Sequence, residues 1–157
     1  MKLYFLRHAQ AEGHDKPDFE RWITEQGRRR TQTAARVMAA LGIRPAHIYS
    51  SPRVRARETA EIVAGALKMK VELTDAVNFG FSVQGVSELT AGLNPADEVM
   101  FVGHEPSMSV VIGHLTGALV EMKKGGLARV DLSDYDAMRG ALVWLIAPGV
   151  FDALGKE

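Results

Sequence analysis

Two short apolar runs that each lead to a histidine constrain the fold of this 157-residue chain more than any other feature. Residues 3–6 (LYFL) lead into Arg7 and His8, and residues 99–102 (VMFV) precede His104 by one glycine. Continuous apolar runs of this length are typical of strands buried on both faces of a parallel sheet. Because open α/β sheets bind ligands beyond the carboxyl ends of their strands, both histidines are expected at one functional edge.

The rest of the chain alternates between helical and strand patterns. Thr24 and Ser51 are suitable N-caps, and Pro52 suits a first helical position. Helices are expected over about 24–41, 52–67, 82–93 and 106–115, and further strands over 46–50, 70–73, 127–132 and 141–146. The last two strands, joined by the turn-rich residues 133–136, predict an antiparallel hairpin at the sheet edge. The pattern predicts a three-layer α/β fold with a mostly parallel central sheet and helices on both faces.

Composition bounds the possible functions. The length and 46% hydrophobic content predict a single domain over 1–157. Nineteen basic and nineteen acidic residues cancel, so no overall field favours nucleic acid or an anionic membrane, and neither is expected as a partner. The chain has no cysteine, which excludes disulfides, thiolate metal sites and cysteine nucleophiles. No apolar run approaches the ~20 residues of a membrane span, and the N-terminal run is shorter than the ~7–15 residues of a signal peptide, so a cytoplasmic location is expected.

An arginine cluster at the start of the helix expected from Pro52 indicates an anion site. Arg53, Arg55 and Arg57 crowd a helix N-terminus, where the helix dipole disfavours cations unless an anion is bound. Arg53 and Arg57 share a helix face, and Arg57 has Glu61 four residues on, so both are expected to be solvated. Arg55 points elsewhere and is the candidate for binding an anion.

His8 is the candidate nucleophile, because a neutral imidazole can attack phosphorus near neutral pH. Arg7 keeps its charge, so it is expected to lower the pKa of His8 and to bind a phosphoryl oxygen. His104 is placed to hold another oxygen. A phosphoryl group in transfer carries charge on three equatorial oxygens, which suits such a cationic cradle. The remaining histidines show no metal-ligand spacing, so neither a metal nor a cofactor is expected.

Three segments resemble the signatures of the histidine phosphatase superfamily, which has a phosphoglycerate mutase-like fold. They are residues 6–9 (LRHA), 50–60 (SSPRVRARETA) and 102–106 (VGHEP), and their order and spacing match as well. With the short length and residues 125–130 (GGLARV), the chain is most similar to the small SixA-type phosphohistidine phosphatases. The resemblance spans nearly the whole chain. It implies that His8 is phosphorylated during turnover, and that Arg7, Arg55 and His104 complete the phosphate pocket.

The chain departs from the commonest family pattern at two points. Ala9 stands where most members have glycine, and no carboxylic acid that would protonate the leaving oxygen can be identified. Candidates for that acid, each expected to be an ordinary surface carboxylate, are Glu12, Asp15, Asp18 and Glu88. Imidazole is a better leaving group than an alkoxide, so a phosphohistidine substrate relaxes the need for a strong acid.

These observations predict a phosphatase that hydrolyses phosphohistidine in a partner protein through a covalent histidine intermediate. A small phosphate ester is the alternative substrate. Phosphoglycerate mutase activity is less favoured, because the short chain leaves little room for segments that would exclude water. A phosphate-binding docking module is the non-enzymatic alternative, although a pure binder does not need a nucleophile.

Overall fold

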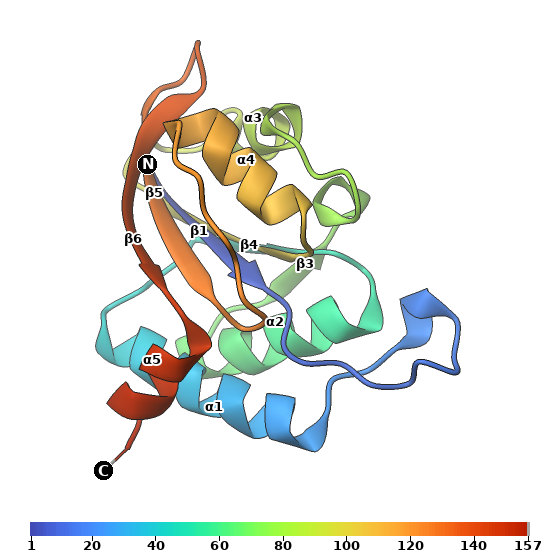
Figure 1. The fold of residues 1–157 in the computed structure, drawn as a ribbon. Coiled ribbons are helices and arrows are strands. Elements are labelled where there is room, and N and C mark those ends of the chain that lie inside the picture. The colour runs from blue at the N-terminus through green and yellow to red at the C-terminus, as the bar shows by residue number, and fades with distance from the viewer. Residues whose placement is uncertain (157) are drawn as a thin grey trace.

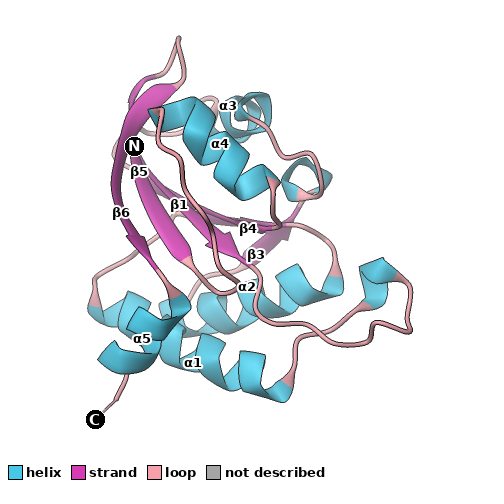
Figure 2. Ribbon diagram, viewed as in Figure 1, coloured by secondary structure: helices cyan, strands magenta, loops and turns pink. Residues whose placement is uncertain are grey.

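The two histidine-terminated runs form neighbouring strands at the centre of a six-stranded sheet. The computed structural model describes residues 1–156 (Figures 1 and 2). Its strands are β1 Lys2–Arg7, β2 His47–Ser50, β3 Val71–Leu73, β4 Glu98–Gly103, β5 Leu127–Asp134 and β6 Arg139–Ile146. The sheet order is β3-β2-β4-β1-β5-β6, with β3, β2, β4 and β1 parallel and β5 and β6 antiparallel. The predicted mixed α/β sheet with an antiparallel hairpin at its edge is therefore confirmed.

Helices cover both faces of this sheet, as Figure 1 shows. They are α1 Glu25–Ala40, α2 Val54–Leu67, α3 Val83–Thr90, α4 Ser107–Thr116 and α5 Pro148–Leu154, with 3₁₀ turns η1 Asp18–Glu20 and η2 Asp75–Val77. In β1, Tyr4 and Leu6 pack toward α1, α2 and α5, whereas Leu3 and Phe5 pack toward α3 and α4. A strand covered on both faces has no polar side, which explains its uninterrupted apolar sequence.

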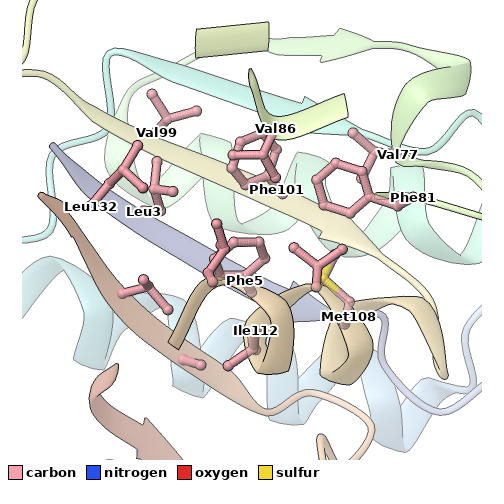
Figure 3. Packing of buried hydrophobic residues seen from close by; sticks show 14 of the residues in the cluster. Leu3, Phe5, Val77, Phe81, Val86, Val99, Phe101, Met108, Ile112 and Leu132 are labelled. Atoms are coloured by element: carbon pink, nitrogen blue, oxygen red, sulfur yellow. The ribbon is translucent and has the colours of Figure 1, made fainter. Parts of the chain in front are cut away.

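Aromatic rings form much of the core on the α3 and α4 side (Figure 3). Phe101 lies 5.3 Å from Phe5 and 5.2 Å from Phe81, measured between ring centroids. Both rings on the central strands are fully buried, and Met108 and Ile112 of α4 pack over them. This packing fixes the positions of β1 and β4, and hence of the residues that follow them.

The register of the central strands places the two histidines side by side, one after the end of β1 and one after the end of β4. Arg7 of β1 is paired with Gly103 of β4, and His8 donates its backbone N–H to the Gly103 carbonyl at 3.0 Å. Gly103 also permits a close approach, since a Cβ at this position would lie 2.8 Å from the carbonyl oxygen of Val77. The chain after η2 therefore comes close to the end of β4.

The start of α2 differs from the prediction. The helix begins at Val54 with Arg53 as its N-cap residue, rather than at Pro52 after a Ser51 cap. Ser51, directly after β2, is still bonded to β4, because its N–H donates to the Val102 carbonyl at 3.0 Å. The helix can therefore begin only after this bonded residue.

Other boundaries also differ from the sequence prediction. Helix α3 covers only Val83–Thr90, within the predicted 82–93. The C-terminal helix α5 was not predicted, because its seven residues are too few to establish a helical period. Its anchor is Phe151, which is buried in the core beneath α1. None of the helices within residues 1–156 combines the length and apolar content that crossing a membrane requires.

Candidate active site

Three of the four predicted site residues meet at the carboxyl edge of the sheet. His8 follows β1, His104 follows β4, and Arg55 lies in the first turn of α2. The centroids of the two imidazole rings are 5.2 Å apart, and Arg55 Nε lies 3.4 Å from His8 Nε2. All three side chains are buried, with residue exposures of 7% for His8, 2% for His104 and 4% for Arg55. Segments about fifty residues apart in the chain therefore converge on one small volume.

His8 is held with one ring nitrogen free to attack. Its Nδ1 lies 2.7 Å from the carbonyl oxygen of Ala9, and a carbonyl can only accept, so Nδ1 carries the proton. In the neutral ring the unshared pair is then on Nε2, which accepts the long hydrogen bond from Arg55 Nε. A ring fixed in this tautomer presents a nucleophilic nitrogen without further rearrangement.

The surroundings of His8 keep its ring neutral. Burial is the largest cause and lowers its pKa from the ordinary value of 6.5 to about 4, and the charges of Arg55, Arg7 and Lys124 act in the same direction. The expected effect of Arg7 is therefore present, although it is smaller than that of burial. At neutral pH the Nε2 pair is available.

His104 is held by the opposite ring nitrogen. Its Nε2 lies 2.8 Å from Ser51 Oγ, which also accepts the Arg53 backbone N–H at 3.3 Å. With the Arg53 N–H occupying a lone pair of Oγ, the serine hydroxyl can donate to Nε2, which leaves the proton of a neutral His104 on Nδ1. Burial lowers the pKa of His104 to about 3, and the nearby His8 and Arg55 add to this effect.

Asp18 of η1 reaches into the site and bridges two arginines. Its Oδ2 accepts from Arg53 Nη1 at 2.5 Å and from Arg55 Nη2 at 3.2 Å, and its backbone carbonyl accepts from Arg55 Nη1 at 2.9 Å. Although burial opposes the shift, the charge and hydrogen bond of Arg55 and the charge of Arg53 hold the pKa of Asp18 below its ordinary value. Asp18 is a half-exposed surface carboxylate, as expected, but its bonds to Arg53 and Arg55 give it a place at the site that the sequence did not predict.

Arg53 was expected to be solvated, and this expectation is wrong. Its side chain is only 18% exposed, because it packs over the ring of Phe79 with Cζ 3.9 Å from the ring centroid. Its Nε donates to Asn78 Oδ1 at 2.7 Å. Arg57 behaves as expected and pairs with Glu61 at 3.8 Å on the helix surface.

Arg7 lies at the end of β1 next to the histidines. Its Nη1 donates to the carbonyl of Met122 at 2.8 Å, and its backbone N–H bonds to Gly126. The segment that precedes β5 therefore orients this guanidinium. Its charge is one of the smaller causes that lower the pKa of His8, after burial and the charge of Arg55.

Two buried donor positions at this site lack a protein partner. They are Arg7 Nε and His104 Nδ1, which belong to two of the four residues predicted to bind phosphate. Buried polar atoms are normally hydrogen-bonded, and an unsatisfied donor costs about 1–3 kcal/mol. Oxygens of a bound anion are acceptors that donors of this kind can bond to. This arrangement is suited to binding a phosphoryl group.

Three residues that build the site have no role predicted from the sequence. Thr59 of α2 links the segment after β1 to α2. Its Oγ1 accepts from Ala9 N–H at 3.0 Å and donates to the Arg55 carbonyl at 2.8 Å. Asn78 and Phe79 line the site from the loop after η2. Thr59 lies within the second family signature, so the sequence offered a reason to include it among the site residues. Nothing local in the sequence marks Asn78 or Phe79.

A cavity of about 260 Å³ lies between the end of β1 and helices α1, α2 and α5. Ala9, Gln10 and Lys124 form its wall nearest to the site, and Phe151 and Met38 line its apolar part. None of the four predicted site residues lines it. The cavity therefore borders the candidate site at Thr59 without containing its predicted catalytic side chains. Within residues 1–156, no group of three or more metal-ligating side chains is placed to hold a metal ion.

Comparison with known proteins agrees with this geometry. The family model of the histidine phosphatase superfamily (branch 1) matches residues 3–78, which contain the first two signatures. An uncharacterized protein of Picosynechococcus sp. (strain PCC 7002) is 32% identical over 142 residues, covering 81% of this chain and 82% of that protein. The chain belongs to the histidine phosphatase superfamily.

Solved structures place the chain beside the SixA-type members of this family. The putative phosphohistidine phosphatase SixA from Agrobacterium tumefaciens is 26% identical, with a TM-score of 0.78 over 94% of this chain and 97% of that one. The protein histidine phosphatase SixA complexed with tungstate has a TM-score of 0.85 at 22% identity, over 95% and 98% of the two chains. A mycobacterial glucosyl-3-phosphoglycerate phosphatase also shares the fold, with a TM-score of 0.73, 16% identity and coverage of 90% and 96%. The protein is a phosphatase of the histidine-nucleophile type.

Proposed function

We propose that this phosphatase hydrolyses phosphohistidine in a partner protein, and that His8 carries the phosphoryl group between the two steps. His8 Nε2 is the nitrogen left with a free pair when Nδ1 is bound to Ala9, and the lowered pKa keeps that pair available. Arg7, Arg55 and His104 bind the phosphoryl oxygens in this proposal. Their charges and hydrogen bonds stabilise the negative charge of the transition state.

The first step transfers the phosphoryl group to the enzyme. His8 Nε2 attacks phosphorus, the bond from phosphorus to the substrate imidazole nitrogen breaks, and that nitrogen keeps the bonding pair. The leaving ring departs as neutral imidazole when its distal nitrogen already carries a proton. The phosphoryl oxygens replace the weak contact at 3.4 Å between Arg55 Nε and His8 Nε2.

The second step returns the enzyme to its starting state. A water oxygen attacks phosphorus, the P–Nε2 bond breaks, and its electron pair returns to His8. The water gives one proton to solvent, and inorganic phosphate leaves. In this proposal, the water takes the place of the first product once that product has departed.

The state of Asp18 is the observation that favours a phosphohistidine substrate. It is the carboxylate that hydrogen-bonds to the arginines of the site, and those arginines keep it ionised by lowering its pKa. An ionised carboxylate cannot donate a proton to an alkoxide leaving group. A P–N substrate needs that proton less, since imidazole is a good leaving group.

A small-molecule phosphomonoester phosphatase is the second candidate. The glucosyl-3-phosphoglycerate phosphatase that shares this fold acts on such an ester. A docking module that only binds phosphate is disfavoured, because the site keeps a histidine locked in the tautomer that nucleophilic attack requires.

Turnover of both substrate classes in parallel tests the proposal. A histidine-phosphorylated protein domain is compared with a panel of sugar and nucleotide phosphates, using His8→Ala as the blank for each. We expect kcat/KM for the phosphoprotein to be higher by at least about tenfold, which corresponds to 1.36 kcal/mol of transition-state binding. Equal or faster turnover of the small esters would overturn the proposal in favour of the second candidate.

A further inference from the structure

Two partly exposed phenylalanines flank the phosphate site. Phe19 in η1 is 44% exposed and Phe79 after η2 is 52% exposed. Single exposed apolar residues are common on protein surfaces and need no explanation. These two, however, come from segments sixty residues apart and meet the same guanidinium, that of Arg53. We call Phe19, Arg53 and Phe79 the aromatic rim.

Phe79 connects this rim to the reacting groups. Its ring meets the ring of His104 edge-on, with centroids 4.8 Å apart and planes at 65°. The Arg55 guanidinium carbon lies 5.8 Å from the Phe79 centroid. Phe79 is thus adjacent to two groups that are proposed to hold the phosphoryl oxygens, while half of its surface remains open. In the proposed function, a group attached directly to phosphorus would therefore leave beside that surface.

Hydrogen bonds hold Arg53 and the backbone of Phe79 in place. Arg53 Nε donates to Asn78 Oδ1 and its Nη1 donates to Asp18 Oδ2, so both ends of the guanidinium are bound. The same Asn78 oxygen accepts the backbone N–H of Phe79 at 2.8 Å. Side chains fixed in this way lose little conformational entropy when a ligand packs against them.

The chemistry of the rim indicates the shape of the leaving group. Aromatic faces and a guanidinium plane bind flat rings by stacking, edge-on contact and burial of apolar area. A sugar or alkyl chain carries hydroxyl groups or tetrahedral carbons that gain less from such a surface. The imidazole of phosphohistidine and the phenol of an aryl phosphate are both flat rings bonded directly to the phosphoryl group.

We propose that the aromatic rim is a specificity site that favours phosphoryl groups carried directly on an aromatic ring. The inference rests on the proposed phosphoryl chemistry at His8 and deepens it by naming the surface that recognises the leaving group. Phe79 and Phe19 contact the leaving ring, and Arg53 fixes the spacing between them.

Substitution of the phenylalanines tests the proposal. Phe79→Leu and Phe19→Leu are compared with the wild type on phenyl phosphate and on a fluoroalkyl phosphate whose leaving alcohol has similar acidity. Loss of an aromatic contact is expected to lower the aryl-to-alkyl ratio of kcat/KM by about three- to tenfold, mainly through KM. Val143→Ala, an exposed site on β6 that is 44% exposed, is the control and should leave the ratio unchanged.

The contact of Phe79 with His104 makes a purely structural role the main competing explanation. If Phe79→Leu lowers kcat for both substrates equally and Phe19→Leu leaves the ratio unchanged, the two rings only support the site and the proposal is wrong. Phe19 meets Arg53 rather than His104, so a fall of the ratio in Phe19→Leu supports recognition independently. Phe79→Tyr keeps the ring and is expected to restore the wild-type ratio.

A third substrate separates this proposal from the proposed function. A peptide that carries phosphohistidine is added to the same series. If wild-type enzyme hydrolyses it no better than the fluoroalkyl ester while the aryl-to-alkyl ratio still falls in both leucine variants, the proposed function fails and the rim stands. If the peptide is a good substrate but no variant changes the ratio, the rim fails and the proposed function stands.

Discussion

The ends of β1 and β4 look alike in sequence but present different chemistry. Each strand has four consecutive apolar residues and is followed directly by a histidine, and the two strands are neighbours in the sheet. Both imidazoles have strongly lowered pKa values because they are buried. His8 is bound through Nδ1 to a backbone carbonyl, whereas His104 is bound through Nε2 to the Ser51 hydroxyl. One ring therefore offers a lone pair and the other offers a donor.

This difference shows that the strand places a side chain and that its hydrogen-bond partner decides what the side chain can do. The tautomer of a neutral imidazole follows from the group that its other nitrogen meets. Phosphoryl transfer needs a nucleophile next to a hydrogen-bond donor that can bind a phosphoryl oxygen. Our account predicts unequal consequences when each histidine and its partner are changed.

The largest effect is expected from His8→Ala. Without Nε2 no covalent intermediate can form, so kcat should fall by roughly 10⁴-fold or more. Steady-state turnover of a phosphohistidine protein measures this loss. Residual activity within tenfold of the wild type would remove His8 from its proposed role.

His104→Ala should be less severe. Loss of one donor to a developing phosphoryl charge typically costs about 10²–10³ in kcat, and transfer to His8 still proceeds. Rapid-quench measurement of both steps is the check, because phosphoenzyme should still accumulate slowly. A variant that is as inactive as His8→Ala and forms no phosphoenzyme would contradict the division of roles between the two histidines.

Ser51→Ala tests how the partner of His104 sets its tautomer. Loss of the hydroxyl that bonds to Nε2 is expected to lower kcat by about tenfold. Nitrogen NMR of the imidazole should show the proton of His104 on Nδ1 in the wild type and a mixture of tautomers in the variant. Ser51→Thr keeps the hydroxyl and serves as the matched control. An unchanged tautomer in Ser51→Ala would show that Ser51 does not set it.

The smallest effects are expected from changes of pH, which act on the protonation of His8 and His104 and on the free energy of unfolding. In the folded protein the pKa of His8 is about 4 and that of His104 about 3, against 6.5 for an ordinary histidine. The unfolded chain therefore binds more protons between pH 6.5 and these values, and the histidines contribute stability that is complete above pH 6.5 and is lost as pH falls.

Two measurements check this pH dependence. NMR titration of His8 should show a neutral ring down to about pH 5, and urea unfolding should show a free energy that declines below pH 6.5. The decline should be weaker in the double variant His8→Asn and His104→Gln, in which these two groups no longer titrate. A His8 midpoint near 6.5 would contradict the buried, neutral nucleophile.

The sheet was predictable because each central strand has a recognisable pattern in its own residues. The runs at residues 3–6 and 99–102 are apolar throughout, and helical periods separate the strands. The N-terminus of α2 was not predictable from the local sequence. Ser51 and Pro52 favour a helix start there, but the backbone bond from Ser51 to Val102 holds the chain against β4 at that point. Pairing between distant segments overrode the local preference.

The same reason explains which parts of the site were missed. His8, His104, Arg7 and Arg55 stand at positions whose local pattern already marks a strand end or a helix start. Asn78 and Phe79 follow η2, whose last residue, Val77, packs closely against Gly103 at the end of β4. Arg53 and Asp18 gain their roles from a contact between η1 and α2 that spans thirty-five residues. Such contacts have no signature in the local sequence.

Identification of the phosphorylated atom tests the central claim most directly. The enzyme is incubated with a labelled phosphohistidine protein, quenched in base within the first turnover, and mapped by tandem mass spectrometry. Our account predicts an acid-labile, base-stable phosphoryl group on His8 that is lost in His8→Ala. Label on His104, or turnover with no phosphorylated histidine in the enzyme, would contradict it.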